Sequence, residues 1–214
     1  MTSLQRFRAA MARNLGRIIT PEVAAEIEME ALTEPDRSIT GADLGTDQYG
    51  GLEFHVEPFG DVLPELHALH EQHWAETERF RHGIALKPNY DYLHEAERRG
   101  NLLQLTARKG TRLVGNIRMY LFEDIHTSTK GAKEDTFYLC PEVRQGLNAI
   151  RFWQFNERCL AVLGVREVRT DSKILKDDAG NVIRNVGRLN ERLGYTHVSN
   201  GYAKRLESTD DTKR

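Results

Sequence analysis

The chain has 214 residues, of which 39% are apolar, 8% aromatic and 29% charged, which is enough to bury one core and form one main domain. Lys and Arg number 30 and Asp and Glu number 32, so the net charge of −2 gives no general attraction to nucleic acid or to an anionic membrane. No apolar run reaches the roughly 18 residues that span a bilayer, and no signal-peptide pattern follows the N-terminus. Two cysteines, Cys140 and Cys159, occur without a Cys-x-x-Cys motif. We therefore expect a cytoplasmic protein without a membrane or nucleic-acid partner.

Residues 2–17 predict a basic amphipathic helix. They contain four arginines and no acidic residue, and their apolar side chains recur at helical spacing: Leu4, Phe7, Met11 and Leu15. A mitochondrial transit peptide has a similar composition, but Ser is scarce and an acidic helix follows, so docking onto this protein or a partner is favoured. Thr20 and Pro21 predict the start of that acidic helix, which runs to Leu32 and can pair with the first.

Residues from about 33 to 51 have the Gly, Asp, Thr and Pro content of a linker. We therefore divide the chain into an N-terminal helical extension with linker at 1–50, a main domain at 51–207 and a disordered tail at 208–214. Alternating patterns and turn residues predict strands at 52–57, 102–108, 112–122, 135–140, 165–170, 195–199 and 202–206. Helical periodicity predicts helices at 62–80, 90–99, 147–163 and 182–193. This order predicts an α+β fold, with a mixed sheet covered by helices on both faces.

The segment from Tyr138 to Trp153 predicts a strand, a tight turn and the start of a helix. The turn contains Arg144 and Gly146. A helix N-terminus has unpaired N–H groups and about half a positive charge, so this junction can hold a pyrophosphate. The sequence therefore favours a nucleotide-type cofactor.

The main domain resembles the GNAT superfamily of acyl-CoA N-acyltransferases, especially the branch found in bacteriophage genomes. The resemblance spans about residues 52 to 206. It rests on the loop Arg144-Gln-Gly-Leu-Asn-Ala149, on Leu193-Gly194-Tyr195, and on the phage-type segments His73-Trp74-Ala-Glu76, Lys87-Pro-Asn-Tyr90 and Asp135-Thr-Phe-Tyr-Leu-Cys-Pro-Glu142. The chain departs from the family where glycines are common in the loop and where an Asn and a Tyr general acid are common later: Gln145, Leu147, Ile183 and Asn190.

The resemblance implies direct transfer of an acetyl group from acetyl-CoA to a primary amine on a small molecule or a protein. It also implies a twisted, mostly antiparallel sheet of about six or seven strands after the N-terminal helical extension. The residues that it places at the coenzyme are Leu139, Cys140, Arg144, Gln145, Gly146, Leu147, Asn148 and Ala149. Pro141 can interrupt strand pairing there and leave backbone groups open to a pantetheine arm.

Acetylation needs a neutral amine, and deprotonating a lysine-like amine about 3 units below its pKa costs about 4 kcal/mol. Residues near the start of the central strand are candidates for the base, although each is also a reasonable surface residue: Glu134, Asp135 and His126. Residues expected on the acceptor side, or otherwise in the core, are His73, Trp74 and Tyr138. Cys140 is expected to be an inert buried thiol, and the spacing of His67, His70 and His73 does not predict a metal site.

A second interpretation is a binding protein, or a virion-associated structural protein, that has the GNAT shape without turnover. The altered loop, the missing Tyr and the basic first helix are compatible with it, as they are with a homodimer or a virion component. A modifier of tRNA-linked amines is less favoured, because no basic patch stands out beyond residue 17.

Overall fold

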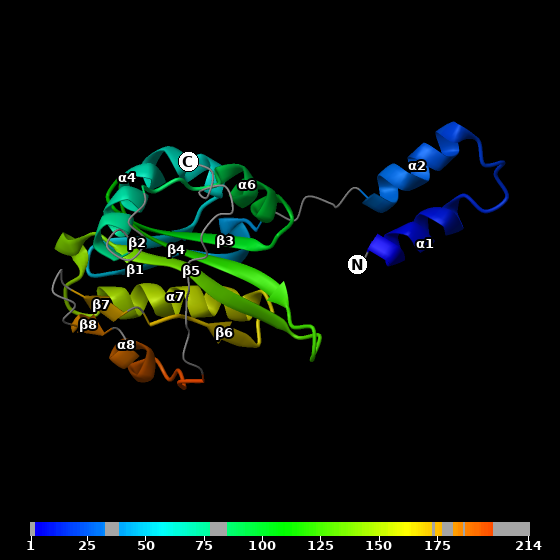
Figure 1. The fold of residues 1–214 in the computed structure, drawn as a ribbon. Coiled ribbons are helices and arrows are strands. Elements are labelled where there is room, and N and C mark those ends of the chain that lie inside the picture. Colours follow the sequence, from blue (N-terminus) through cyan, green and yellow to red (C-terminus); the bar gives the residue numbers. More distant parts are fainter. Residues whose placement is uncertain are drawn as a thin grey trace, which may run out of the picture. The chain divides into compact units, whose positions relative to one another are not determined.

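The computed structural model describes residues 3–32, 39–77, 85–172, 174–176, 182–185 and 187–198. The chain forms two compact units, Met1–Asp171 and Ser172–Arg214. The first unit contains a six-stranded sheet of order β1-β2-β3-β4-β5-β6 (Figure 1). The second contains a two-stranded antiparallel sheet of β7 (Ile174–Lys176) and β8 (Val182–Asn185), followed by α8 (Gly187–Arg192). The division of the chain at residue 50 stays a prediction, and the tail at 208–214 lies outside the described residues.

The six-stranded sheet is mostly antiparallel. Its strands are β1 (Asp47–Tyr49), β2 (Leu52–Val56), β3 (Leu102–Lys109), β4 (Arg112–Glu123), β5 (Lys130–Leu139) and β6 (Glu167–Arg169). The first five form antiparallel neighbours, and β6 alone runs parallel to β5. The expected mixed, mostly antiparallel sheet is confirmed, and so is the β3–β4 hairpin around Gly110, whose φ is 60°. β1 lies in the segment that the sequence predicted to be a linker. It was not predicted as a strand, because its three residues have no alternating apolar pattern.

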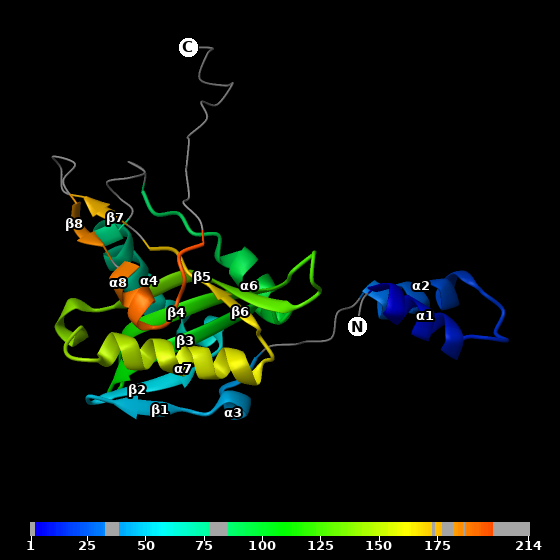
Figure 2. The same ribbon diagram turned by 90° about the horizontal axis from the view of Figure 1, so that it is seen from below.

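Helices cover both faces of this sheet, as predicted. α4 (Phe59–Thr77) and α6 (Tyr90–Arg98) lie on one face, and α7 (Asn148–Val162) crosses the other (Figures 1 and 2). On the α7 side, Phe152 stacks on Phe54 with ring centroids 4.9 Å apart, and Phe137 lies 5.1 Å from the Trp153 ring. A short helix, α3 (Gly41–Leu44), precedes β1.

The two N-terminal helices, α1 (Ser3–Arg13) and α2 (Pro21–Leu32), pair with each other. They bury a small cluster of Ala10, Val23 and Ile27, and Arg17 forms an ion pair with Glu26 at 3.3 Å. The expected pairing of a basic with an acidic helix is confirmed, whereas docking onto a partner stays a prediction. None of the helices in the described ranges is long and apolar enough to cross a membrane.

The sequence misplaced several boundaries. A helix over 182–193 is wrong in its first part, because Val182–Asn185 pairs with β7 as a strand, as its β-branched Val and Ile favour. The strand expected at 195–199 is absent from residues 195–198, and its last residue, like the next strand at 202–206, lies outside the described residues. β5 begins five residues before the expected strand, because Lys130 to Lys133 pair with the end of β4 despite their low apolar content.

The aromatic cluster under α7 predicts a large loss of stability for Phe152→Ala. Phe152 is fully buried, so its removal leaves a cavity and should lower the free energy of unfolding by about 3–5 kcal/mol. Val162→Ala is the matched control on the same helix, since Val162 is 68% exposed. Urea unfolding of both variants measures the difference, and equal losses would contradict this packing.

Candidate functional site

The connection from β5 to α7 is a compact loop built on one glycine. Cys140 N–H still donates to Val114 O of β4 at 2.8 Å, and Pro141–Val143 then forms one turn of 3₁₀ helix, η1. Gly146 has φ of 57°, a left-handed conformation in which a Cβ is strained, and it lets the chain turn into α7. The predicted strand, turn and helix are therefore confirmed, with Gly146 at the turn.

Asn148 fixes this loop from inside. Its Nδ2 donates to Val143 O at 2.9 Å, its backbone N–H donates to Gln145 O at 3.2 Å, and its side chain is buried. A Cβ on Gly50 would lie 2.3 Å from Asn148 Oδ1, so the β1–β2 turn packs directly against it. Of the residues expected at the coenzyme, Asn148 thus has a side chain that supports the loop rather than one that faces outward.

The loop and the first turn of α7 contain backbone N–H donors that are not used within the loop. The N-cap residue of α7 is Leu147, whose side chain makes no capping hydrogen bond. Within the described part of the chain, no acceptor pairs with the N–H groups of Gln145, Gly146, Leu147, Ala149 and Ile150. Unpaired N–H groups at the start of a 15-residue helix attract an anion through both hydrogen bonding and the helix dipole.

Arg144 is turned back toward the body of the protein. Its Nε donates to Leu139 O at 2.6 Å, and its two terminal nitrogens form a bidentate pair with Glu76 of α4, each at 2.6 Å. The guanidinium also lies 5.0 Å from the centre of the Tyr138 ring. Hydrogen bonding to Glu76 raises the pKa of Arg144. The structure therefore places Arg144 as a brace between α4 and the loop, with contacts that the sequence did not predict.

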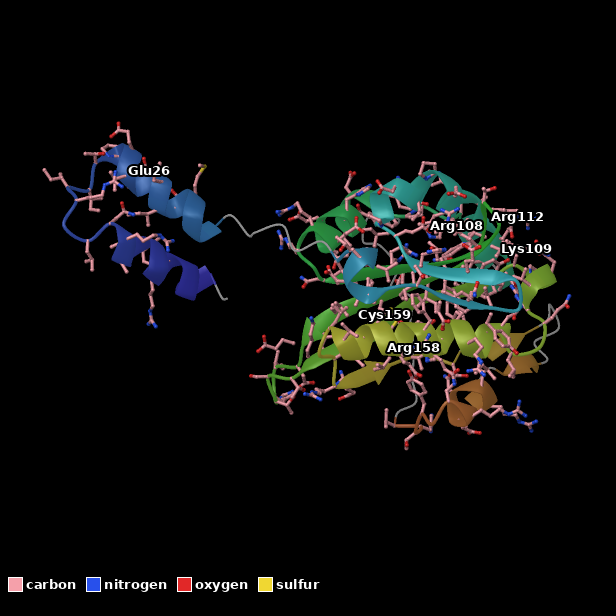
Figure 3. The ribbon with its side chains drawn as sticks, turned by 180° about the vertical axis from the view of Figure 1, so that it is seen from behind. Glu26, Arg108, Lys109, Arg112, Arg158 and Cys159 are labelled. Atoms are coloured by element: carbon pink, nitrogen blue, oxygen red, sulfur yellow. The ribbon has the colours of Figure 1, made fainter. Side chains whose placement is uncertain are left out.

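Other basic side chains lie at this end of the sheet. Figure 3 shows Arg108, Lys109 and Arg112 together around the β3–β4 turn. Arg112 pairs with Glu142 of η1, and Arg108 is held by Glu57 and Glu65. Carboxylates therefore offset the charge of both arginines at this end of the sheet.

The edge of β5 that faces β6 is open beyond its first residues. β6 pairs with Gly131, Ala132 and Lys133 only. From Glu134 to Leu139, β5 has no second strand neighbour among the described residues, although β4 pairs with it on the other side. A strand edge of this kind can pair with an extended ligand through backbone hydrogen bonds.

The candidate bases lie at a bulge in β5. Arg118 of β4 is opposite Thr136 and Met119 is opposite Glu134, so Asp135 is the extra residue. The Glu134 carboxylate accepts a hydrogen bond from Thr170 Oγ1, just after β6. Asp135 Oδ2 accepts from Arg118 at 2.7 Å and from Thr136 Oγ1 at 3.0 Å, whereas Asp135 Oδ1 has no donor among the described residues.

His126 is not brought to the same place. It lies in the exposed β4–β5 turn, where its N–H donates to Asp124. β5 runs from that turn to the loop before α7, and its ten residues span roughly 30 Å at about 3.3 Å each. His126 and the loop are therefore at opposite ends of the strand.

Of the residues expected on the acceptor side, His73 and Trp74 belong to α4, and Tyr138 lies on β5. The His73 and Tyr138 rings are 5.2 Å apart, and Tyr138 Oη donates to Gln72 at 3.4 Å. Burial raises the pKa of Tyr138 and, together with Glu142, that of the Cys140 thiol, which agrees with an inert Cys140. Trp74 is half-buried one position beyond His73.

A buried polar chain continues from the bulge to α6, and the sequence reading missed it. Arg118 is 8% exposed, and its Nη1 lies 3.4 Å from His70 Nε2. His70 Nδ1 lies 3.1 Å from Tyr90 Oη. Burial, with Arg118 nearby, lowers the pKa of His70 to about 3, so the ring is neutral at pH 7. The sequence did contain a signal for the burial of Arg118, because a strand covered by helices on both faces places every one of its side chains under a helix.

The comparisons with known proteins address the fold. No protein-family model and no curated protein matches the sequence. Solved structures do match, among them a ribosomal-protein-alanine N-acetyltransferase from Brucella melitensis biovar Abortus 2308, with 15% identity, a TM-score of 0.57, and coverage of 73% of this chain and 99% of that chain.

Two further matches are also acetyltransferases. A predicted acetyltransferase with acetyl-CoA from Clostridium acetobutylicum has 10% identity, a TM-score of 0.53, and coverage of 72% of this chain and 96% of its own. AAC(6')-Iy in complex with the bisubstrate analog CoA-S-monomethyl-acetylneamine has 15% identity, a TM-score of 0.53, and coverage of 73% and 99%. At these identities the likeness shows the fold, so the GNAT-type architecture is confirmed and the bacteriophage branch stays a prediction.

The Arg144 brace predicts a measurable coupling. In a double-mutant cycle of Glu76→Ala and Arg144→Ala, we expect a coupling free energy of about 1–2 kcal/mol, because the pair is bidentate and partly buried. The cycle of Glu95→Ala and Arg98→Ala on α6 is the control, since that pair is exposed, and its coupling should be smaller. Urea unfolding measures both, and equal coupling would contradict the bracing role.

The neutral His70 predicts an acid-sensitive fold. Its pKa is about 3 in the folded protein and near 6.5 when unfolded, so between these values only the unfolded chain binds the proton. Stability should therefore fall as pH drops from about 6.5 toward 3, by up to about 1.4 kcal/mol per pH unit from this group. His70→Gln removes this group, so urea unfolding from pH 7 to 4.5 should show a shallower pH dependence than wild type. Parallel profiles would contradict the assignment.

Proposed function

We propose that the protein is an N-acetyltransferase that transfers an acetyl group from acetyl-CoA directly to a primary amine. One observation carries the proposal: beyond its three residues paired with β6, the same edge of β5 has no strand neighbour in the described chain, and this edge leads to a loop whose N–H groups have no acceptor there. A diphosphate and an extended amide chain, the two parts of coenzyme A nearest its thiol, have the chemistry that these features accommodate.

Backbone groups would hold most of the coenzyme. The N–H groups of Gln145, Gly146, Leu147 and Ala149 would bind the diphosphate, and the open edge of β5 up to Leu139 would pair with the pantetheine amides. Arg144 already satisfies Leu139 O and would contribute charge through its remaining N–H groups. The diphosphate would therefore bind at the loop that the sequence predicts, with backbone N–H groups as its main ligands.

The amine would be deprotonated at the bulge. The coenzyme supplies an activated thioester carbonyl when bound, and the protein must supply the roughly 4 kcal/mol that neutralising the amine costs. Asp135 Oδ1 has no donor among the described residues, while Arg118 fixes the other oxygen. This arrangement suits a base held by a third group, and Glu134 is the alternative. His73, Trp74 and Tyr138 would line the amine side.

A binding protein without turnover is the second candidate, and the Arg144–Glu76 pair favours it, because that arginine is engaged before any ligand arrives. Attachment to a virion, formation of a homodimer, a cytoplasmic location and the absence of nucleic-acid or membrane partners stay predictions.

Coenzyme binding tests the proposal at one exposed side chain. Leu147 is 44% exposed at the start of α7. Leu147→Glu adds a negative charge beside the proposed diphosphate site, and calorimetry should show at least about a tenfold loss of acetyl-CoA affinity, whereas Leu147→Lys, of similar size and opposite charge, should bind at least as well as wild type. Equal affinity of all three would place the diphosphate elsewhere, and no binding by wild type would remove the coenzyme from the proposal.

Thiol release separates the two candidate functions. Acetyl-CoA binding together with amine-dependent release of free thiol would support the transferase. Binding without release on any amine would favour the binding protein.

A further inference from the structure

The polar chain of Asp135, Arg118, His70 and Tyr90 joins four different elements: the β5 bulge, β4, α4 and the start of α6. We propose that it forms the acceptor site, with Tyr90 Oη as a hydrogen-bond donor, and that the acceptor therefore carries an oxygen as well as its amine. The inference rests on the proposed function, because it names the substrate class of the same site.

The direction of each hydrogen bond follows from Arg118. A guanidinium can only donate, so His70 Nε2 must accept from it. The hydrogen of the neutral imidazole is then on Nδ1 and is donated to Tyr90 Oη at 3.1 Å. The hydroxyl hydrogen of Tyr90 consequently points away from His70, and no acceptor for it lies within the described residues.

Asp135 and Tyr90, the two ends of this polar chain of side chains, are complementary to an amine and an oxygen. Asp135 Oδ1 is an acceptor with no donor in the described chain, and Tyr90 Oη–H is a donor with no acceptor there. Asp135 and Tyr90 are both partly exposed, whereas Arg118 and His70 between them are buried. The outer groups are therefore the ones that a ligand can reach, and the inner two fix their spacing.

A contribution to stability does not by itself explain why these polar side chains are buried. A sheet face that packs against a helix is ordinarily apolar, and burying a guanidinium costs several kcal/mol of desolvation that its ion pair only partly offsets. Here the α4 side of the central strands is polar in two adjacent rows: Thr106, Asn116 and Tyr138, then Gln104, Arg118 and Thr136. Polar groups kept at such a cost are expected at a ligand site.

The acceptor class is tested with matched amines. We would compare ω-amino alcohols of increasing length with alkylamines of the same length, measuring thiol release from acetyl-CoA. At the length that spans the two ends, wild type should favour the amino alcohol by about 5- to 10-fold in kcat/KM. Tyr90→Phe keeps the ring against His67, 4.9 Å away, and should lose this preference through KM.

Two further variants sharpen the test. Tyr92→Phe removes an exposed hydroxyl from the same helix and should keep the preference. His70→Leu leaves the Tyr90 hydroxyl in place without its orienting donor and should also lose the preference in KM, an effect that lower stability alone would not produce. A wild type without preference at any length, or a preference that survives in Tyr90→Phe, would overturn the assignment.

A failure of the acceptor-site assignment can be distinguished from a failure of the proposed transferase function. If wild type acetylates no amine, the transferase proposal fails, and binding of the same amines measured by calorimetry without acetyl-CoA still decides the role of Tyr90. Tighter binding of amino alcohols to wild type than to Tyr90→Phe would support the acceptor site, and equal binding would overturn it.

Discussion

The buried guanidinium of Arg118 needs a counter-charge, and the bulge in β5 supplies it. The extra residue at Asp135 places that carboxylate and Thr136 on the same side as Arg118. Beyond the bulge, Tyr138 faces α4, where it meets His73, and Phe137 faces α7, where it meets Trp153. Without the bulge, every later residue of β5 would face the opposite side of the sheet. The bulge thus fixes which side chains of β5 each helix can contact.

Three polar residues of α4 contact residues of β4, of β5 and of the loop after β5, and these contacts fix where the helix lies on the sheet. His70 lies at Arg118, Gln72 lies at Tyr138 and Cys140, and Glu76 lies at Arg144. A helix that covers a sheet with leucines alone could slide with little change in energy, whereas directional contacts at several successive turns fix its position. The loop before α7 and the bulge are therefore connected through one helix, although the loop begins several residues after the bulge.

The sequence predicted much of the fold but few of the contacts in the candidate site. Alternation from Leu113 to Leu121 was enough to predict the hairpin, and the helical stripe from Phe152 to Cys159 was enough to predict α7, because both patterns depend on neighbours in sequence. The partners of Arg144 and Arg118 were not predicted, since Glu76 and His70 are distant in sequence and their pairing depends on where α4 lies. β6 was predicted as a strand, but its three-residue overlap with β5 has no local signal.

The backbone angles of the loop also explain why its departure from the family pattern leaves the proposed anion-binding geometry in place. Glycine is required only where φ is positive, and that occurs at Gly146. Leu147, at a position where the resembled family usually has glycine, has φ of −103° and ψ of 10°, which any residue can adopt. Its side chain is partly exposed while its N–H remains without an acceptor in the described chain. Because the donors are backbone groups, the loop can vary in sequence and still present them to the proposed diphosphate, provided that the one glycine and the buried Asn148 remain.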